Sequence, residues 1–403
     1  MNWNPLFAAR TAHMKRSTVR ETLKLAAQPG MISFAGGLPA PELFPLDDVR
    51  RAAETVLRER GPAALQYGET EGVGELRDWI AREFSRPHFQ LTRANVAIVS
   101  GGQQALDLLG RIFLNEGDPV IVENPTYLAL LAAWRPFGVR FETVPSDANG
   151  MRVEMLAPLL RQRPKLIYAT PTFQNPQGTT LNAERRAQLV ALVREHEIGV
   201  VEDNPYGDLR YNGEALPHLL ELDARTGADG ALDSHVIYTG TFSKVLAPGL
   251  RIGWVIATET VIDKLVQAKQ AADLHTSTFN QYLVAELLRN GTLERQLPRL
   301  RDAYRVRRDT MLAALEKHFP AGVSWTRPDG GLFLMVTLPH HLNAFDLLHR
   351  AVERKVAFVP GEDFHLNGAG RNTFRLNFSN ASREQIEDGV QRLGEVLREL
   401  LKQ

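Results

Sequence analysis

A lysine and an arginine lie close together in the stretch TFSKVLAPGLRIGW, residues 241–254, among groups that suit a phosphate. Lys244 follows the hydroxyls of Thr241 and Ser243, and Arg251 comes seven residues later. Hydroxyls, a guanidinium fork and helix N–H groups are the partners that a phosphate dianion requires. An isolated lysine is more often a surface cation, but a lysine beside such a site can form a Schiff base with an aldehyde. The stretch therefore predicts a site for a phosphorylated aldehyde.

Polar residues also follow other apolar runs, where strands are expected to end. SGGQQALDLL (100–109) places two glycines before a helical pattern, which allows a tight turn against a ligand at a helix N-terminus. Asp203 ends the run IGVVED, Tyr206 follows three residues later, and Asn175 lies in TPTFQNPQGTT. A carboxylate buried at a strand end either caps a turn or faces a cationic ligand atom. Each segment alone also fits an ordinary turn.

Taken together, these groups match one cofactor. The phosphate site, the amine of Lys244 and the carboxylate of Asp203 complement a phosphate, an aldehyde and a ring nitrogen, which pyridoxal phosphate combines. The dinucleotide pattern GxGxxG is not found in the expected strand–helix setting. We therefore expect pyridoxal phosphate as cofactor and no metal.

The elements that must position these residues alternate along the chain. Between about 95 and 260, short apolar runs alternate with amphipathic helical patterns such as 103–113 and 184–197. This alternation favours an α/β fold, in which helices cover both faces of a mostly parallel sheet. Such sheets bind ligands beyond the carboxyl ends of their strands. The expected strands are 96–100, 119–123, 139–144, 165–170, 198–203, 235–240 and 252–257.

The C-terminal part has a different pattern. A long, charge-rich helical stretch at about 284–318 precedes strand patterns in 324–338, 356–361 and 373–379 and a last amphipathic helix. We expect a large cofactor-binding domain and a smaller α+β domain, with the N-terminal segment packing on the small domain. The expected boundaries are 1–45 for that segment, 46–285 for the large domain and 286–403 for the small domain.

The composition excludes several classes of protein. In 403 residues, 47 Lys and Arg balance 47 Asp and Glu, so no net charge draws the chain to nucleic acid or to an anionic membrane. The absence of cysteine excludes disulfides, thiolate zinc sites and cysteine nucleophiles. No apolar run approaches the roughly 20 residues of a membrane helix, and the first residues lack an apolar secretory core. We expect a cytoplasmic protein that binds neither nucleic acid nor membrane.

In this order and over nearly the whole chain, these residues resemble the class I/II aminotransferases of fold type I, and TFSK followed by GLRIG is highly specific. The resemblance implies that Lys244 holds pyridoxal phosphate as a Schiff base and later moves the substrate's α-proton. It implies that Asp203 pairs with the ring nitrogen, and that Asn175 and Tyr206 bind the phenolic oxygen. Thr241 stands where the family more often has serine, and the hydroxyl is kept. The other contacts implied are Tyr127 on the ring face and Gly102, Gln103, Thr241, Ser243 and Arg251 around the phosphate.

The same resemblance implies how substrates bind. Arg375, in TFRLNFS, matches the arginine that binds the substrate α-carboxylate, although it could also be a cation on an edge strand. Tyr67, in LQYGETEG, matches a tyrosine that reaches the phosphate of the neighbouring subunit's cofactor, which implies a homodimer with shared active sites. Gly36 and Gly37 are expected to let the backbone pass close to the substrate.

Residues 17–45 resemble the start of the prokaryotic 2-aminoadipate aminotransferases of lysine biosynthesis. This implies ping-pong transfer of an amino group between glutamate/2-oxoglutarate and 2-aminoadipate/2-oxoadipate. Arg20 matches an arginine that meets the distal carboxylate in those enzymes. Independently, Thr18 and Glu21 have the form of a capping box, which places Arg20 in a first helical turn. A cation there opposes the helix dipole, and this small cost is better explained if an anion binds to it. The alternative is a solvated arginine.

Three other functions remain open at this point. The first is a broad aromatic or branched-chain aminotransferase, since such enzymes are relatives of this subgroup. The second is a transcription regulator with an aminotransferase-like domain, which needs a DNA-binding domain upstream, whereas only about 30 residues precede the loop at 35–45. The third is a pyridoxal-phosphate enzyme for β-elimination or decarboxylation, which Arg375 does not exclude.

Overall fold

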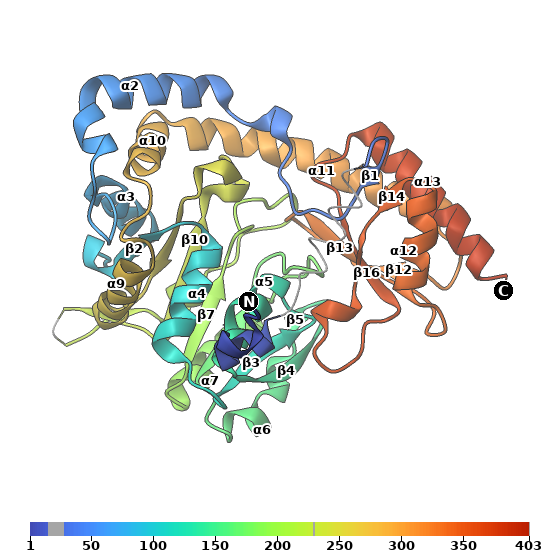
Figure 1. The fold of residues 1–403 in the computed structure, drawn as a ribbon, viewed down its shortest axis with the longest axis horizontal. Helices are drawn as coiled ribbons and strands as arrows, with labels where there is room; N and C mark the ends of the chain where they lie inside the picture. The colour runs from blue at the N-terminus through green and yellow to red at the C-terminus, as the bar shows by residue number, and fades with distance from the viewer. Residues whose placement is uncertain (15–27, 229, 403) are drawn as a thin grey trace.

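The structure, a computed structural model, describes residues 1–14, 28–228 and 230–402. Its largest sheet lies in the first two thirds of the chain and is drawn in Figure 1. All seven strands expected from the sequence belong to it. Within the described residues its strands, in spatial order, are β2 (Val96–Val99), β11 (Gly253–Ile256), β10 (Val236–Thr241), β7 (Gly199–Asp203), β6 (Leu166–Ala169), β3 (Pro119–Asn124), β4 (Arg140–Asp147) and β5 (Gly150–Met151).

The sheet is mostly parallel, as predicted. The pairings of β10 with β7, β7 with β6, β6 with β3 and β3 with β4 are parallel. Strand β11 runs antiparallel to both of its neighbours, and β5 runs antiparallel to β4. Because parallel strands end at one edge, the residues that follow β6, β7 and β10 are brought together there.

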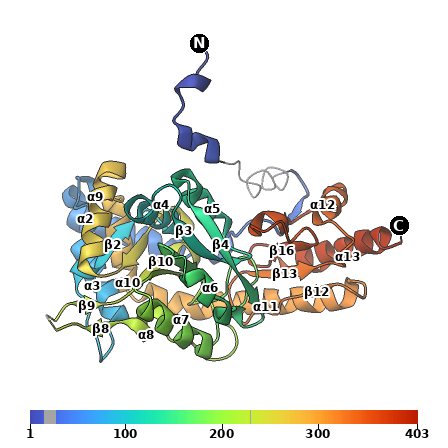
Figure 2. The same ribbon diagram turned by 90° about the horizontal axis from the view of Figure 1, so that it is seen from below.

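Helices cover both faces of this sheet. Successive strand residues point to opposite sides, so Val96 and Ile98 join one apolar core, whereas Ala97 and Val99 join the other. Figure 2 shows α4 and α5 on one side of the sheet and α7 and α8 on the other. The helices around the sheet are α2 (Leu46–Leu65), α3 (Gly74–Phe84), α4 (Gly102–Phe113), α5 (Leu128–Trp134), α6 (Ala157–Leu160), α7 (Ala183–Glu195), α8 (Leu219–Asp223), α9 (Glu259–Asp273) and α10 (Thr278–Arg289).

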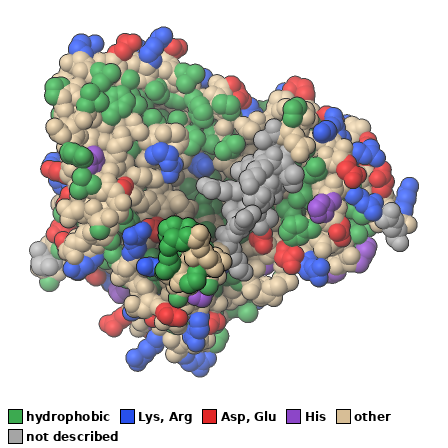
Figure 3. Space-filling view, in the orientation of Figure 1, with side chains coloured by type: hydrophobic (Ala, Val, Ile, Leu, Met, Phe, Trp, Pro, Cys, Tyr) green, Lys and Arg blue, Asp and Glu red, His purple; other side chains and the backbone are tan. Residues whose placement is uncertain are grey.

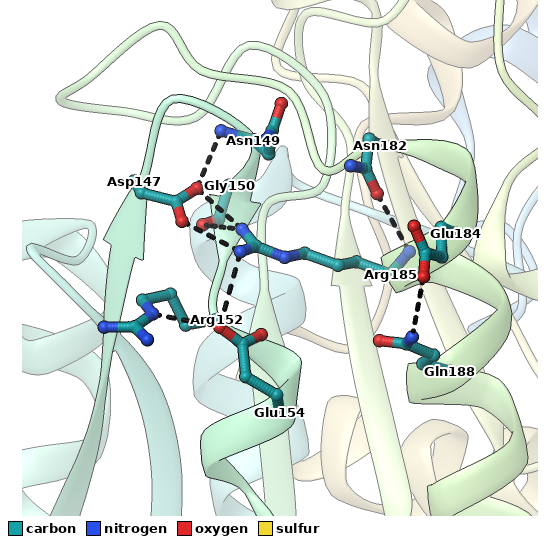
Figure 4. A network of polar contacts seen from close by, with 9 residues as sticks. All are labelled: Asp147, Asn149, Gly150, Arg152, Glu154, Asn182, Glu184, Arg185 and Gln188. Carbon is teal, nitrogen blue, oxygen red and sulfur yellow. Dashed lines mark hydrogen bonds and ion pairs between the residues drawn. The ribbon is translucent and has the colours of Figure 1, made fainter.

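A polar cluster fixes the start of α7 (Figure 4). Asn182 caps the helix by accepting the N–H of Arg185 at 2.9 Å. The Arg185 guanidinium donates to both carboxylate oxygens of Asp147, at 2.6 and 2.8 Å. Bidentate pairs of this kind fix orientation as well as distance. The cluster thus holds α7 against the β4–β5 hairpin, and with it the end of the 170–182 loop that carries Asn175.

A second, smaller sheet belongs to the C-terminal part. Its strands, in spatial order, are β12 (Ser324–Trp325), β13 (Phe333–Thr337), β16 (Thr373–Asn377) and β15 (Val359–Pro360). Near it lie α11 (Thr292–His318), α12 (Ala344–Glu353) and α13 (Arg383–Leu400), and Figure 1 shows α11 running from α10 toward this sheet. The prediction of a single helical stretch at about 284–318 is wrong in detail, because two helices, α10 and α11, cover it. The stretch is divided at Gly291, whose φ of +66° is a left-handed conformation that glycine adopts without strain.

One part of the N-terminal segment, residues 32–34, lies against this C-terminal part, whereas η2 (Ala9–His13) contacts η5 (Arg135–Phe137) of the large-sheet part. Strand β1 (Ile32–Ser33) pairs in parallel with β14 (Val356–Ala357), and the carbonyl of Phe34 accepts the N–H of Asn377 at 2.9 Å. The domain boundaries at 45 and 285 stay a prediction. A further pair of short strands, β8 (Arg225–Thr226) and β9 (Leu232–Asp233), forms a surface hairpin. Among the described residues, no helix is long and apolar enough to cross a membrane.

Candidate active site

A cavity of about 160 Å³ opens beyond the carboxyl ends of the strands of the large sheet. Ten residues that the sequence predicts as cofactor contacts line it, together with four that it does not predict: Leu106, Thr170, Pro205 and Gly240. The predicted residues in the lining are Gly102, Gln103, Tyr127, Asn175, Asp203, Tyr206, Thr241, Ser243, Lys244 and Arg251. Segments far apart in the chain thus meet at the place where an open α/β sheet binds ligands.

Lys244 ends a short 3-10 turn, Phe242–Lys244, that follows β10 directly. The Thr241 side chain accepts the N–H of Ser243 and so caps this turn. The Lys244 amine donates to the carbonyl of Gly37 at 3.0 Å. Burial, together with the positive charges of Arg251 and Arg375, lowers the pKa of Lys244 to about 8. A lysine with this pKa has a substantial neutral fraction near physiological pH, and the neutral amine is the form that acts as a nucleophile or base.

Asp203 ends β7 and is held by two hydroxyl groups. Tyr168 donates to Oδ2 at 2.6 Å, and Thr239 donates to Oδ1 at 2.9 Å. Burial raises the pKa of Asp203, while the two hydrogen bonds oppose that shift. Within the described residues this carboxyl group forms no ion pair, so a cationic ligand atom in the cavity would supply the missing counter-charge. The protonated ring nitrogen of pyridoxal phosphate is such an atom.

One end of the cavity has the donors for a phosphate. Helix α4 begins there after Gly101, and the hydroxyls of Thr241 and Ser243 lie 2.9 Å apart. Arg251 has a left-handed backbone with φ +55° and donates from Nη2 to the carbonyl of Ser100 at 2.7 Å. A Cβ atom on Gly101 would clash with that nitrogen, so only glycine permits this approach. A helix N-terminus, two hydroxyls and a guanidinium thus meet at one place.

Two phenols and an amide line the middle of the cavity. Burial raises the pKa of Tyr127 to about 12 and raises the pKa of Tyr206 further. Both phenols therefore keep their protons at physiological pH and can donate a hydrogen bond. Asn175 is buried, and its Oδ1 accepts from Arg375 Nη1 at 2.7 Å.

Arg375 on β16 is 3% exposed. Its Nη2 donates to the carbonyl of Ala35 at 2.7 Å, and the guanidinium carbon lies 4.2 Å from the ring centroid of Phe333. Its Nε has no hydrogen-bond partner within the described residues. Burial lowers the pKa of Arg375 to about 10. A buried guanidinium with neutral partners gains strongly from an incoming anion, and it suits a carboxylate.

The remaining predicted residues lie outside the cavity lining. Gly37 meets the site through its carbonyl, and a Cβ atom there would lie 2.8 Å from the ring of Phe333. Tyr67 is 78% exposed, and its ring lies edge-on to His275 rather than in this chain's cavity. Arg20 and its capping box lie outside the described residues.

Sequence reasoning missed several contributors to the site, among them Thr239, which donates to Asp203, and two hydroxyl groups at the end of a neighbouring strand. Tyr168 and Thr170 lie two residues apart at the end of β6, and the Thr170 hydroxyl donates to that of Tyr168 at 3.3 Å. Because side chains alternate along a strand, this spacing gives both the same face. Two hydroxyls at i and i+2 at the end of an apolar run were the available signal.

Comparison with known proteins shows the family of the chain. The model of the family "Aminotransferase class I and II" matches residues 31–393, so the chain belongs to that family. It is thus an aminotransferase of fold type I that depends on pyridoxal phosphate, as the resemblance implied. Among its relatives, a 2-aminoadipate transaminase of Thermus thermophilus is 46% identical over 403 residues, which cover 100% of this chain and 98% of the relative.

Two further relatives extend the comparison. The aromatic-amino-acid aminotransferase 1 of Thermococcus litoralis is 41% identical over 412 aligned residues. The alignment covers 100% of this chain and 96% of the relative. The crystal structure of LysN, an alpha-aminoadipate aminotransferase of Thermus thermophilus, was solved with N-(5'-phosphopyridoxyl)-L-leucine. It matches with a TM-score of 0.92 and 44% identity over 100% of both chains.

Proposed function

We propose that this aminotransferase transfers an amino group between glutamate/2-oxoglutarate and 2-aminoadipate/2-oxoadipate, and that it also accepts apolar or aromatic amino acids. The similarity to a 2-aminoadipate transaminase at 46% and to an aromatic-amino-acid aminotransferase at 41% identity supports both parts. The observation that carries the reaction class is that one site contains both Lys244, whose pKa is lowered, and Arg375, a buried guanidinium with only neutral hydrogen-bond partners. Lysine biosynthesis is the pathway that this specificity suits.

In this proposal, each group at the cofactor end has one task. Pyridoxal phosphate supplies an aldehyde that condenses with amines and a ring that takes up the electrons of a carbanion. Lys244 binds that aldehyde and, once released, carries the α-proton. Asp203 keeps the ring nitrogen protonated, and Asn175 and Tyr206 bind the phenolic oxygen. Tyr127 packs on the ring, and the phosphate is held by Gly102, Gln103, Thr241, Ser243 and Arg251.

The substrate end uses Arg375 for the α-carboxylate. Nη1 and Nη2 already point to two oxygen atoms, those of Asn175 and Ala35, so the fork is fixed before substrate arrives. The carbonyl of Gly37 lies 3.0 Å from the Lys244 amine, so the backbone at Gly37 would lie close to a substrate that reacts at this lysine. Arg20 is proposed to meet the distal carboxylate of a dicarboxylate substrate.

We further propose that the enzyme is a homodimer with shared active sites. Large apolar side chains are strongly exposed along α2 and near it, and Figure 3 shows hydrophobic side chains gathered over α2 and α10. Contiguous exposed apolar patches are typical of interfaces. The exposed residues are Leu46, Leu57, Leu65, Tyr67 and Leu274. Tyr67, exposed in one chain, would reach the cofactor phosphate of the partner subunit. Sedimentation at micromolar protein concentration tests whether the dimer forms.

The substrate assignment is tested by kcat/KM for 2-oxoadipate against 4-methyl-2-oxopentanoate, with glutamate as donor. The wild type is compared with Arg20→Ala and with Arg10→Ala, an exposed arginine in the described N-terminal segment, as a control. We expect 2-oxoadipate to be preferred and Arg20→Ala alone to lose that preference. If the branched oxoacid is preferred, or if Arg20→Ala leaves the ratio unchanged, the enzyme is a broad aromatic/branched-chain aminotransferase. The cytoplasmic location stays a prediction that cell fractionation would test.

A further inference from the structure

Lys269 on α9 is completely buried but does not line the cavity. Its amine contacts Asp273 Oδ1 at 2.7 Å and Oδ2 at 2.9 Å, and it donates to Gln104 Oε1 at 3.1 Å. Lysine is rarely fully buried unless it is paired, because removing an ammonium group from water is costly. Burial lowers the pKa of Lys269, and the pair with Asp273 opposes that shift. Packing alone would need only an apolar side chain at this position, so a buried lysine here indicates a further role.

The pair is connected to the turn between β2 and α4. Asp273 Oδ2 accepts from Gln104 Nε2 at 2.7 Å and from the Ser100 hydroxyl at 3.2 Å. Gln104 Oε1 in turn accepts the backbone N–H of Ser100 at 2.7 Å. Both donors of Ser100 are therefore bound to groups that Lys269 contacts directly.

The same turn forms one wall of the phosphate end. The carbonyl of Ser100 accepts from Arg251 Nη2, and Gly101 is the N-cap of α4. The next two residues, Gly102 and Gln103, line the cavity. Ser100 thus joins the Lys269 cluster, through its N–H and hydroxyl, to Arg251, through its carbonyl.

We propose that Lys269 and Asp273 are positioning residues for the cofactor phosphate. They fix the Ser100–Gly101 turn, and this aims the Arg251 guanidinium and the first N–H groups of α4 at the phosphate oxygens. The inference rests on the proposed cofactor site. The alternative is an ion pair that only stabilises the packing of α9 on α4, and the two roles differ in what they do to the bound phosphate.

The test is a titration of apoenzyme with pyridoxal phosphate, followed by absorbance, together with the ³¹P chemical shift of the bound phosphate. The variants are Lys269→Met, which keeps most of the side chain, and Asp273→Asn, which keeps the shape but removes the charge. Lys264→Met is the matched control, since Lys264 lies on the same helix, has a 63% exposed side chain and contacts only α9 neighbours in the described residues. Thermal unfolding of each apoenzyme is recorded in parallel.

We expect Lys269→Met to weaken pyridoxal phosphate binding by about tenfold or more, as outer partners of binding groups typically do, and to move the ³¹P resonance. Asp273→Asn should change the Kd and the ³¹P resonance in the same direction. If Lys269→Met fails to fold, the Asp273→Asn variant alone distinguishes the two roles. Lys264→Met should match the wild type. Wild-type Kd and resonance in both cluster variants, with only a lower unfolding temperature, would overturn this inference alone. A wild type that does not bind pyridoxal phosphate would overturn the proposed function as well.

Discussion

Besides burial, two arginines lower the pKa of Lys244, and they differ in their surroundings. Arg251 belongs to the large-sheet part, is exposed to water and donates to backbone carbonyls. Arg375 lies on the small sheet, is 3% exposed and packs against aromatic rings. Water already screens the first charge, whereas the second has lost its hydration before any ligand binds. We infer that an anion gains more from Arg375 than from Arg251, and that the phosphate depends on several donors while the α-carboxylate depends mainly on one.

The largest effect should follow removal of Lys244, whose pKa is lowered by burial and by both arginines. Lys244→Ala loses both the covalent anchor and the group that carries the α-proton, so we expect kcat to fall by about 10⁴-fold or more. Pyridoxal phosphate should still bind, because the phosphate donors remain. Single-turnover kinetics with glutamate measures the loss, and Lys264→Ala on the surface of α9 is the control. A variant that keeps a tenth of wild-type kcat would exclude this role.

Arg375→Ala should have the next largest effect. Losing a bidentate partner of the substrate carboxylate should lower kcat/KM by about 100-fold or more, which is about 3 kcal/mol. Lysine lacks the planar fork, so Arg375→Lys should recover little of it. Steady-state kinetics with glutamate and 2-oxoglutarate measures both variants. The Kd for pyridoxal phosphate should stay within about twofold of wild type, and a tenfold change would place Arg375 at the cofactor instead.

Arg251→Ala should have a smaller effect, and it should weaken cofactor binding rather than lower kcat/KM. An exposed guanidinium that shares the phosphate with hydroxyls and helix N–H groups is worth about 1–2 kcal/mol. We therefore expect the Kd for pyridoxal phosphate to rise about tenfold, while kcat/KM at saturating cofactor changes little. Titration of apoenzyme measures the first quantity. If Arg251→Ala and Arg375→Ala each lost cofactor affinity and kcat/KM equally, the distinction between the phosphate end and the substrate end would be wrong.

The smallest effect concerns the pH dependence of cofactor capture. The pKa of Lys244 is lowered to about 8 by burial and then by Arg251 and Arg375. Since the neutral amine attacks the aldehyde, the limiting capture rate should rise as pH increases through about 8 and then level off. In Arg375→Met one positive charge is lost, so the midpoint should move to higher pH. Stopped-flow absorbance at saturating pyridoxal phosphate measures it, and an unchanged or lower midpoint would contradict the coupling.

The cofactor end could largely be predicted from the sequence, because its signals are local. Lys244, Asp203 and Arg251 directly follow or precede apolar runs, and a parallel sheet brings such strand ends together whatever the details of packing. The seven strands were predicted for the same reason. The antiparallel direction of β11 was not predicted, since the direction of a strand depends on its connections and not on its own residues.

The substrate end was less predictable. Arg375 contacts Ala35, Asn175 and Phe333, which come from separate segments that only the tertiary fold brings together. Its assignment came from family resemblance, as did that of Tyr67, whose exposed position in one chain gives it no site of its own. The aromatic rings around Arg375 carry no sequence signal that separates them from ordinary core residues. Lys269 escaped notice because a buried lysine on a helix looks like a solvated one in sequence.

The account depends most on the covalent role of one lysine. The direct measurement is reduction of the holoenzyme with borohydride, followed by digestion and mass spectrometry to find the residue that carries the phosphopyridoxyl group. We predict that the group is on Lys244 alone, and that Lys269, which is buried behind the phosphate end, is unmodified. A label on another lysine, or no label on a holoenzyme that retains its cofactor, would contradict the site as described.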